Sequence, residues 1–124
     1  MDFMHIELTE LEHAKCEGFN NILLNEVTHG VYRLTINRPK TLNALNSDTL
    51  KEMDRAMDIL ESDPSARVLL ITGAGEKSFV AGADIEHMIH LSPIQGKAFA
   101  EQGMRIFRRL ETLNIPVVAL VNGY

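Results

Sequence analysis

The stretch Val68-Leu69-Leu70-Ile71-Thr72 is a continuous apolar run, and glycine-rich residues follow it from Gly73 to Ala83. A run without polar alternation is typical of a strand that is buried on both faces, and the glycines after it predict a loop. A second apolar run, residues 116–121, predicts another buried strand near the end of the sequence. Two strands of this kind, separated by a helical pattern, indicate an α/β protein with parallel pairing.

A β-hairpin is predicted upstream of these strands. Residues 22–27 and 31–36 are two short apolar segments that flank His29-Gly30. The second segment alternates, with Tyr32, Leu34 and Ile36 on one face, as expected for a strand with one buried face. Pro39 should end the sheet because it has no N–H to donate.

Two amphipathic helices are predicted between the strands. Asn46 and Ser47 both suit the N-cap of the first helix, whose apolar positions recur every three or four residues: Leu50, Met53, Met57 and Leu60. Residues 92–95 (Ser-Pro-Ile-Gln) combine a capping box with proline at the first helical position. The second helix then has an apolar face made of Phe99, Gly103, Ile106, Leu110 and Leu113.

Composition narrows the class of protein. The chain has 124 residues, a length that suits one domain or part of one, and a net charge of −5, which argues against nucleic acid as the main partner. A single cysteine, no basic and apolar secretory leader and no apolar run of about 20 residues predict a cytoplasmic protein that does not enter the membrane. The charged segment 1–20 is predicted to be either a short helix or disordered.

The sequence does not favour a nucleotide-phosphate loop or a metal site. Gly73-Ala74-Gly75 follows a strand as a dinucleotide-binding loop does, but the third glycine is replaced by Ser78, and the spacing of Gly75 and Lys77 does not fit a Walker loop. His87 and His90 could share a helical face and bind a metal, but no further ligand pair is evident. Exposed histidines after a turn are the commoner arrangement, so no metal is expected.

Three segments in this order resemble the enoyl-CoA hydratase/isomerase (crotonase) family: residues 36–45 (INRPKTLNAL), 78–85 (SFVAGADI) and 116–124 (PVVALVNGY). The resemblance implies an α/β fold of the crotonase-like (ClpP/crotonase) type, with a β-β-α spiral core. Residues 21–124 would form the N-terminal half of this acyl-CoA-binding domain. It also implies an acyl-CoA thioester as substrate, no cofactor beyond the coenzyme A of the substrate, and a homo-oligomer, either a trimer or a dimer of trimers.

The resemblance also assigns site residues. Small side chains around Gly82 let a ligand approach the backbone closely, and by resemblance the N–H of Ala83 is one of two oxyanion-hole donors to the thioester oxygen. The alternative is a tight turn that joins a strand to a short helix. The residues expected to contact the acyl-CoA are Lys40, Thr41, Leu42, Ala81, Ala83, Asp84, Ile85 and Glu86. Many relatives have lysine in place of Glu86, so a phosphate contact is not expected there.

The expected activity is hydration of a 2-enoyl-CoA through a thioester enolate, and isomerisation or another reaction of the family stays open. By resemblance, the second oxyanion N–H and the two proton-moving glutamates lie beyond Tyr124. Residues 1–124 alone are therefore expected to show no measurable hydration of crotonyl-CoA and to expose apolar surface. A non-catalytic acyl-CoA-binding or assembly module is the second hypothesis.

Overall fold

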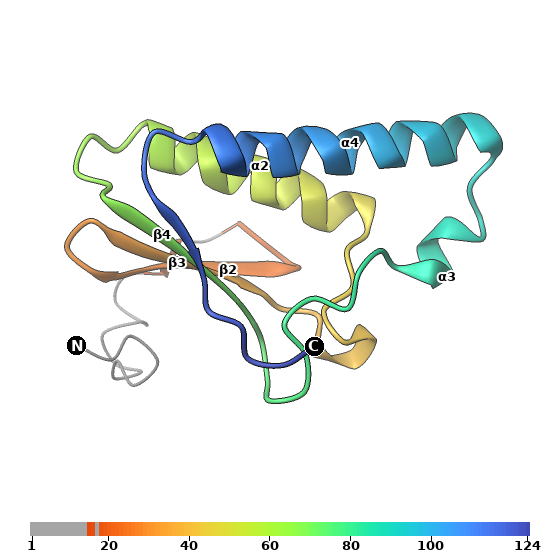
Figure 1. The fold of residues 1–124 in the computed structure, drawn as a ribbon, viewed down its shortest axis with the longest axis horizontal. Coiled ribbons are helices and arrows are strands. Elements are labelled where there is room, and N and C mark those ends of the chain that lie inside the picture. The colour runs from red at the N-terminus through yellow and green to blue at the C-terminus, as the bar shows by residue number, and fades with distance from the viewer. Residues whose placement is uncertain (1–14, 17) are drawn as a thin grey trace.

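The computed structural model describes Lys15, Cys16 and residues 18–124 (Figure 1). The prediction of a helical or disordered segment at residues 1–20 lies mostly outside these residues. The part that is described contains Lys15–Cys16, a two-residue strand, β1, which pairs antiparallel with the next strand.

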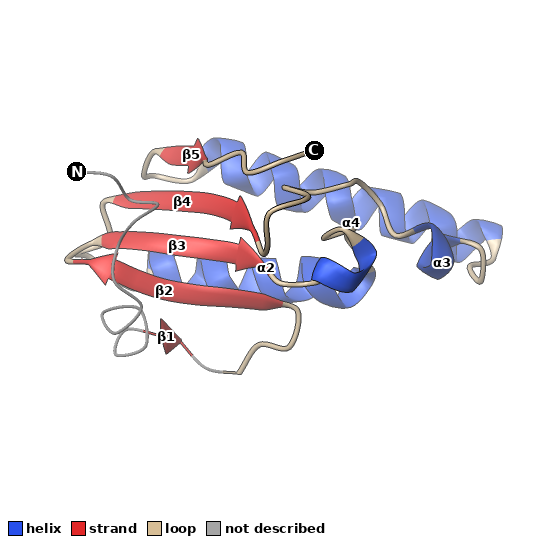
Figure 2. Ribbon diagram, turned by 90° about the horizontal axis from the view of Figure 1, so that it is seen from below, coloured by secondary structure: helices blue, strands red, loops and turns tan. Residues whose placement is uncertain are grey.

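A five-stranded mixed sheet forms one layer of the molecule (Figure 2). Its strands follow one another in sequence order, β1-β2-β3-β4-β5. The pair β2–β3 is the predicted antiparallel hairpin, whereas β3–β4 and β4–β5 are parallel, as the sequence predicts. The four longer strands are β2 (Ile22–Thr28), β3 (Val31–Ile36), β4 (Val68–Gly73) and β5 (Val117–Ala119).

Two long helices, α2 (Ser47–Glu61) and α4 (Pro93–Thr112), lie side by side over one face of this sheet (Figures 1 and 2). Both begin as predicted. The Asn46 side chain accepts a hydrogen bond from the backbone N–H of Thr49 (2.9 Å), and Ser92 and Gln95 form a complete capping box. Short helices occupy the connections: η2 (Pro39–Thr41) after β3 and α3 (Ile85–Met88) before α4.

The core lies between α2 and the sheet. All four predicted apolar positions of α2 are buried there, together with the alternate residues of β2, β3 and β4 that face the helices. Ion pairs also join the two helices. Arg109 of α4 contacts Asp54 and Asp58 of α2 at 2.6 Å each. These contacts hold α4 against α2.

Two elements are less buried than their sequences predict. Strand β5 was expected to be buried, but Val118 keeps 45% of its surface exposed. In the described residues β5 is the edge of the sheet and pairs with β4 alone, so one side has no neighbour. On α4, Ile106 is the one fully buried residue of the predicted apolar face. Phe99, Leu110 and Leu113 are partly buried against the core, and Phe99 and Gly103 also line an open cavity that is described below.

No helix in the described part of the chain combines the length and apolar character that crossing a bilayer requires.

Candidate functional site

The candidate site is built by loops at the carboxyl ends of the parallel strands β3 and β4. In open α/β sheets, ligands bind at this edge, where the chain leaves the strands. Residues 37–46 leave β3, residues 74–84 leave β4, and the two segments lie against each other through several hydrogen bonds. The predicted contact residues are thus brought together, although about 40 positions separate the two groups in the sequence.

Asn43 joins the two loops from a fully buried position. Its side-chain oxygen accepts from the backbone N–H of Arg38 at 2.9 Å, and its amide nitrogen donates to the carbonyls of Ala74 (3.0 Å) and Ser78 (2.9 Å). Its φ of 58° lies in the left-handed region, which asparagine tolerates better than most residues. Asn43 therefore holds the loop after β3 against the loop after β4.

Asn122 fixes the other side of the loop after β4. Its amide nitrogen donates to the carbonyls of Gly73 (2.8 Å) and Gly75 (2.9 Å), while its oxygen accepts from the Gly73 N–H (3.1 Å). A side chain at Gly73 would meet the Phe79 carbonyl at 2.2 Å, so glycine is required there. The buried hydroxyl of Ser78 donates to Leu42 and lies against the carbonyl of Tyr124, which ties the end of the chain into the same cluster.

The backbone N–H of Ala83 is left free by this arrangement. Leu45 pairs with Ala83 in an isolated parallel bridge, in which the Leu45 N–H donates to Gly82 and the Asp84 N–H donates to Leu45, both at 2.8 Å. In such a bridge the N–H of the central residue points to the opposite side. Among residues 18–124 the Ala83 N–H finds no acceptor, and Ala83 itself is exposed.

Gly82 sets the direction of this free donor. Its φ is +119°, a conformation that L residues rarely adopt, although a side chain there would meet nothing within 4 Å. The requirement for glycine is therefore conformational. The peptide that follows Gly82 carries the Ala83 N–H, so the glycine conformation aims the donor.

Asp84 anchors the segment immediately after the donor. Its carboxylate contacts the Arg38 guanidinium at 3.0 Å and accepts from the His87 N–H as the N-cap of α3. Burial alone would raise the pKa of Asp84, but the Arg38 hydrogen bond and charge and the α3 backbone outweigh it and lower the pKa below its usual value. Asp84 stays ionised and fixes the turn rather than serving as a proton donor.

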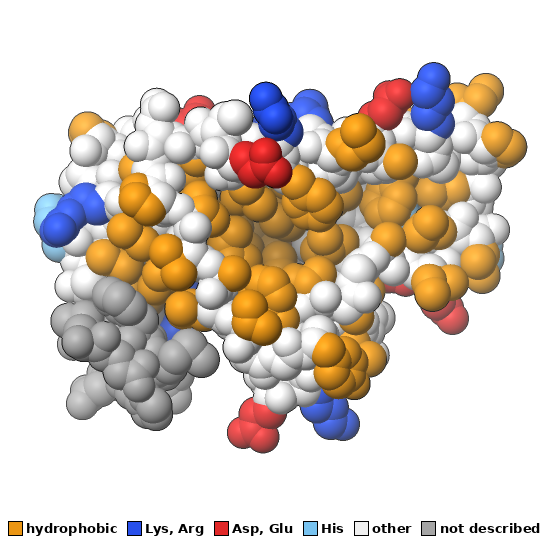
Figure 3. Space-filling view, viewed as in Figure 1, with side chains coloured by type: hydrophobic (Ala, Val, Ile, Leu, Met, Phe, Trp, Pro, Cys, Tyr) orange, Lys and Arg blue, Asp and Glu red, His pale blue; other side chains and the backbone are white. Residues whose placement is uncertain are grey.

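An apolar cavity lies next to the free donor (Figure 3). We call it the α4 cavity; its volume is about 280 Å³, and its walls include Gly82 and Ala83 on one side and α4 on the other. The remaining lining residues are Leu45, Leu50, Val80, Phe99, Ala100, Gly103, Met104 and Phe107. A backbone donor at the wall of an apolar cavity is suited to bind a carbonyl oxygen that carries an apolar group.

The other predicted contact residues fall into two groups, one in the segment around Ala83 and one in the loop after β3. Ala81 donates its N–H to the Leu42 carbonyl at 3.1 Å, whereas Ile85 and Glu86 are exposed on α3. Lys40 and Thr41 are exposed on η2. Lys40 and Leu42 line a hollow of about 430 Å³ that Lys77 and Glu76 border on the other side.

No group of three or more potential metal-ligating side chains comes together anywhere in the described residues. His87 instead packs the edge of its ring against Phe99, with ring centroids 5.0 Å apart.

Comparisons with known proteins show the family of this chain. The sequence profile of the enoyl-CoA hydratase/isomerase family matches residues 26–124. The chain therefore belongs to the enoyl-CoA hydratase/isomerase family. It is 54% identical over 105 residues to a short-chain-enoyl-CoA hydratase of Clostridium acetobutylicum, a match that covers 85% of this chain and 40% of the relative. It is 46% identical to a crotonyl-CoA hydratase of Syntrophomonas wolfei, with 86% and 41% covered.

Solved structures give the same result for the fold. The structure superimposes on an enoyl-CoA hydratase from Bacillus anthracis with a TM-score of 0.81 and 30% identity, covering 84% of this chain and 40% of the other. The enoyl-CoA hydratase from Thermoplasma volcanium gives 0.76 and 30%, with 84% and 41% covered. The predicted crotonase-like α/β fold is confirmed. The chain contains only part of that fold, because it spans about 40% of the length of these relatives.

Proposed function

We propose that this chain is the acyl-CoA-binding front part of an enoyl-CoA hydratase, in which the Ala83 N–H binds the thioester oxygen. The observation that carries the proposal is the N–H of Ala83, which has no acceptor in the described residues and belongs to an exposed residue that lines the apolar α4 cavity. The sequence similarity to hydratases of short-chain and crotonyl thioesters supports the substrate class.

The chemistry explains why a backbone donor suits this position. Addition of water to a 2-enoyl thioester places negative charge on the thioester oxygen, as an enolate. A fixed N–H aimed at that oxygen stabilises the charge without needing to reorganise. The two bonds of Leu45 to Gly82 and Asp84, and the ion pair of Asp84 with Arg38, hold the donor in place before substrate arrives.

The proton-transfer groups are proposed to come from sequence beyond Tyr124. The Tyr124 carbonyl accepts from the Phe79 N–H at 2.7 Å, four residues before Ala83. A continuation of the chain from this point would start beside the donor loop, where a second donor and the acid–base groups are needed. Glu76 and Glu86 are both exposed and are given no catalytic role in this proposal.

Coenzyme A is proposed to lie along the loop of η2. Lys40 and Leu42 border the hollow, with Thr41 between them in the sequence, and Lys77 adds a second ammonium group to its lining. Ala81, Asp84, Ile85 and Glu86 would contact the acyl-CoA mainly through their backbone and apolar atoms, because the Asp84 carboxylate is engaged with Arg38. A cytoplasmic homo-oligomer, with no further cofactor, completes the proposal.

The test removes the Ala83 N–H in the natural protein that carries this sequence. Ala83→Pro deletes the donor, and Ala83→Ser is the matched control, because it keeps the N–H at the same position. We expect Ala83→Pro to lower kcat for crotonyl-CoA hydration by about 10²–10³-fold, and Ala83→Ser to stay within a few-fold of wild type. Circular dichroism of both variants separates loss of the donor from loss of the fold. Equal kcat values for a folded Ala83→Pro variant and wild type would contradict the proposal.

A non-catalytic acyl-CoA-binding or assembly module remains the second candidate, because the chain spans only about 40% of its relatives. Exposed apolar side chains on α3 and α4, such as Ile85 and Ile94, also favour association with another protein. The intact mass of the natural product distinguishes the two. A mass near 13.9 kDa, with no hydration of crotonyl-CoA, would favour the module, whereas a mass about twice as large, as the length of the relatives implies, would favour the hydratase.

A further inference from the structure

Phe99 separates two cavities. On one side is the apolar α4 cavity, which Ala83 lines. On the other is a hollow of about 370 Å³ between α2, α3 and α4, which we call the α3 hollow. Polar and apolar residues both line it: Ser47, Lys51, His87, Leu91, Gln95, Ala98, Phe99 and Gln102. Phe99 is the one residue that lines both.

The Phe99 ring is held in this position from the side of the α3 hollow. His87, which lines that hollow, packs against it at 5.0 Å between ring centroids with an angle of 71°, an edge-to-face contact. His87 belongs to α3, whose N-cap is Asp84, the residue immediately after Ala83. The donor and the residue that supports the Phe99 ring therefore belong to one short stretch of sequence, residues 83–87.

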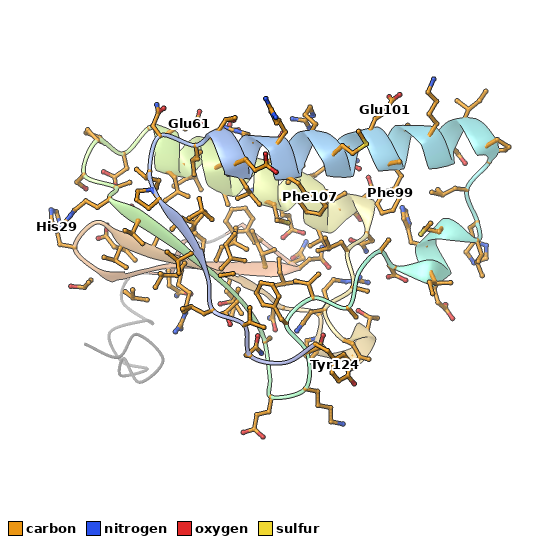
Figure 4. All side chains as sticks on the ribbon, in the orientation of Figure 1. His29, Glu61, Phe99, Glu101, Phe107 and Tyr124 are labelled. Carbon is orange, nitrogen blue, oxygen red and sulfur yellow. The ribbon has the colours of Figure 1, made fainter. Side chains whose placement is uncertain are left out.

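The α4 cavity has a second end, at Phe107. Figure 4 shows that Phe99 and Phe107 both project from the side of α4 that faces the sheet and the loops. Leu45, Val80 and Phe107 also line a neighbouring apolar cavity of about 360 Å³ over β4 and β5, which we call the sheet cavity. Phe79 is on its wall and bonds to Tyr124, so sequence after Tyr124 would begin at the rim of this cavity.

We infer that Phe99 is the end wall of the acyl site and limits the thioester to a short acyl chain. The inference rests on the proposed function. The thioester carbonyl at Ala83 directs the acyl group into the α4 cavity, and the acyl chain extends from there toward Phe99. Beyond Phe99, a longer acyl chain would have to pass the ring and lie against the polar side chains of Lys51, His87 and the two glutamines of the α3 hollow.

The test uses two phenylalanines of the same helix as a matched pair. Phe99→Ala joins the α4 cavity to the α3 hollow, whereas Phe107→Ala enlarges the cavity at its other end. Binding of saturated butyryl-CoA and decanoyl-CoA to the natural protein is measured by calorimetry, and hydration of the corresponding 2-enoyl-CoA thioesters is measured beside it. Burial of each additional methylene strengthens binding about fourfold.

We expect Phe99→Ala to raise the preference for decanoyl-CoA over butyryl-CoA by about tenfold or more, the gain for about two newly buried methylenes. Phe107→Ala should leave the preference within about twofold. His87→Ala removes the support of the ring from outside the α4 cavity, so it should shift the preference in the same direction as Phe99→Ala but less.

An unchanged preference in a folded Phe99→Ala variant would overturn the inference, and so would a gain seen with Phe107→Ala alone. The proposed function is tested separately by the hydration assay. One outcome separates the two: acyl-CoA binds with a chain-length preference that depends on Phe99, while neither wild type nor any variant hydrates its substrate. In that case Phe99 is the end wall of the acyl site, and the hydratase proposal is wrong.

Discussion

Two adjacent parts of one loop, residues 73–79 and residues 80–84, use their backbone polar groups in opposite ways. In the first part, the polar groups of Gly73, Gly75 and Ser78 are bonded to Asn43 or Asn122. In the second part, the bonds of Leu45 satisfy the groups on either side of Ala83 and leave the Ala83 N–H free. The hydrogen bonds of Asn43 and Asn122 thus form a frame that supports the Ala83 donor, which has no acceptor in the described residues. This is the arrangement that preorganised binding of an oxyanion requires.

The largest effect is expected from breaking the frame at Asn43. Asn43→Ala removes three hydrogen bonds from a buried site and places alanine at a φ of 58°. We expect the free energy of unfolding to fall by about 3 kcal/mol or more, measured by urea denaturation. Asn114→Ala is the control, because Asn114 is exposed and should change stability by less than about 0.5 kcal/mol. Similar values for the two variants would show that the frame does not depend on Asn43.

The second prediction concerns Gly103→Leu, which fills the space in front of the donor and leaves the frame unchanged. A side chain built at Gly103 of α4 has its nearest contact at 3.9 Å, on Leu50, and points into the α4 cavity. Gly103→Leu should therefore keep or raise stability, because leucine favours helix over glycine by roughly 0.5–1 kcal/mol. It should weaken crotonyl-CoA binding by about tenfold or more.

Gly96→Leu is the matched control on the same helix. A side chain at Gly96 meets nothing within 4 Å, and Gly96 does not line the α4 cavity. The Gly96→Leu variant should bind crotonyl-CoA with the affinity of wild type, as measured by calorimetry. Equal losses of affinity in both variants would mean that the α4 cavity is not where the acyl group binds.

The smallest expected effect is a pH-dependent change in the free energy of unfolding, caused by substituting Asp84, the residue that anchors the donor segment. The pKa of Asp84 is lowered in the folded protein, so its ionised form stabilises the fold at a pH above the ordinary aspartate pKa of about 3.9. That contribution is complete above about pH 5 and is lost as the pH falls through 4 toward the lowered folded value. Asp84→Asn keeps a good N-cap but loses the charge facing Arg38.

Wild type should therefore exceed Asp84→Asn in free energy of unfolding by about 1–2 kcal/mol at pH 7. The difference should shrink steadily below pH 4. Urea denaturation at a series of pH values checks this, and a difference that grows on acidification would contradict the assigned direction.

The sequence predicted the elements of the fold because their signals are local. Apolar periodicity located α2 and the strands, and the cap residues Asn46 and Ser92 marked both helix starts. The donor segment was assigned through the resemblance of residues 78–85 to the enoyl-CoA hydratase/isomerase family, and its role stays a prediction. The exposure of β5 could not be predicted, because it depends on which strands surround β5 in the sheet.

The frame was missed for a different reason. Each of the three family-like segments contains one residue of the frame: Asn43, Ser78 and Asn122. Their hydrogen bonds join loops that are 35 to 49 positions apart in the sequence, and no local pattern predicts such bonds. The ion pair of Arg38 with Asp84 is equally non-local. A polar residue inside an otherwise apolar or glycine-rich segment, such as Asn43 between Leu42 and Ala44, is the one signal that could have indicated a buried bonding role.

The most direct test of the account is the infrared carbonyl stretch of a bound thioester. Crotonyl-CoA labelled with ¹³C at the thioester carbonyl is compared free and bound to the natural protein, to Ala83→Ser and to Ala83→Pro. A hydrogen bond from the Ala83 N–H polarises this carbonyl, so the account predicts a shift to lower wavenumber in wild type and Ala83→Ser, most or all of which disappears in Ala83→Pro. A bound carbonyl that absorbs at the free position in wild type, or an equal shift in all three proteins, would contradict it.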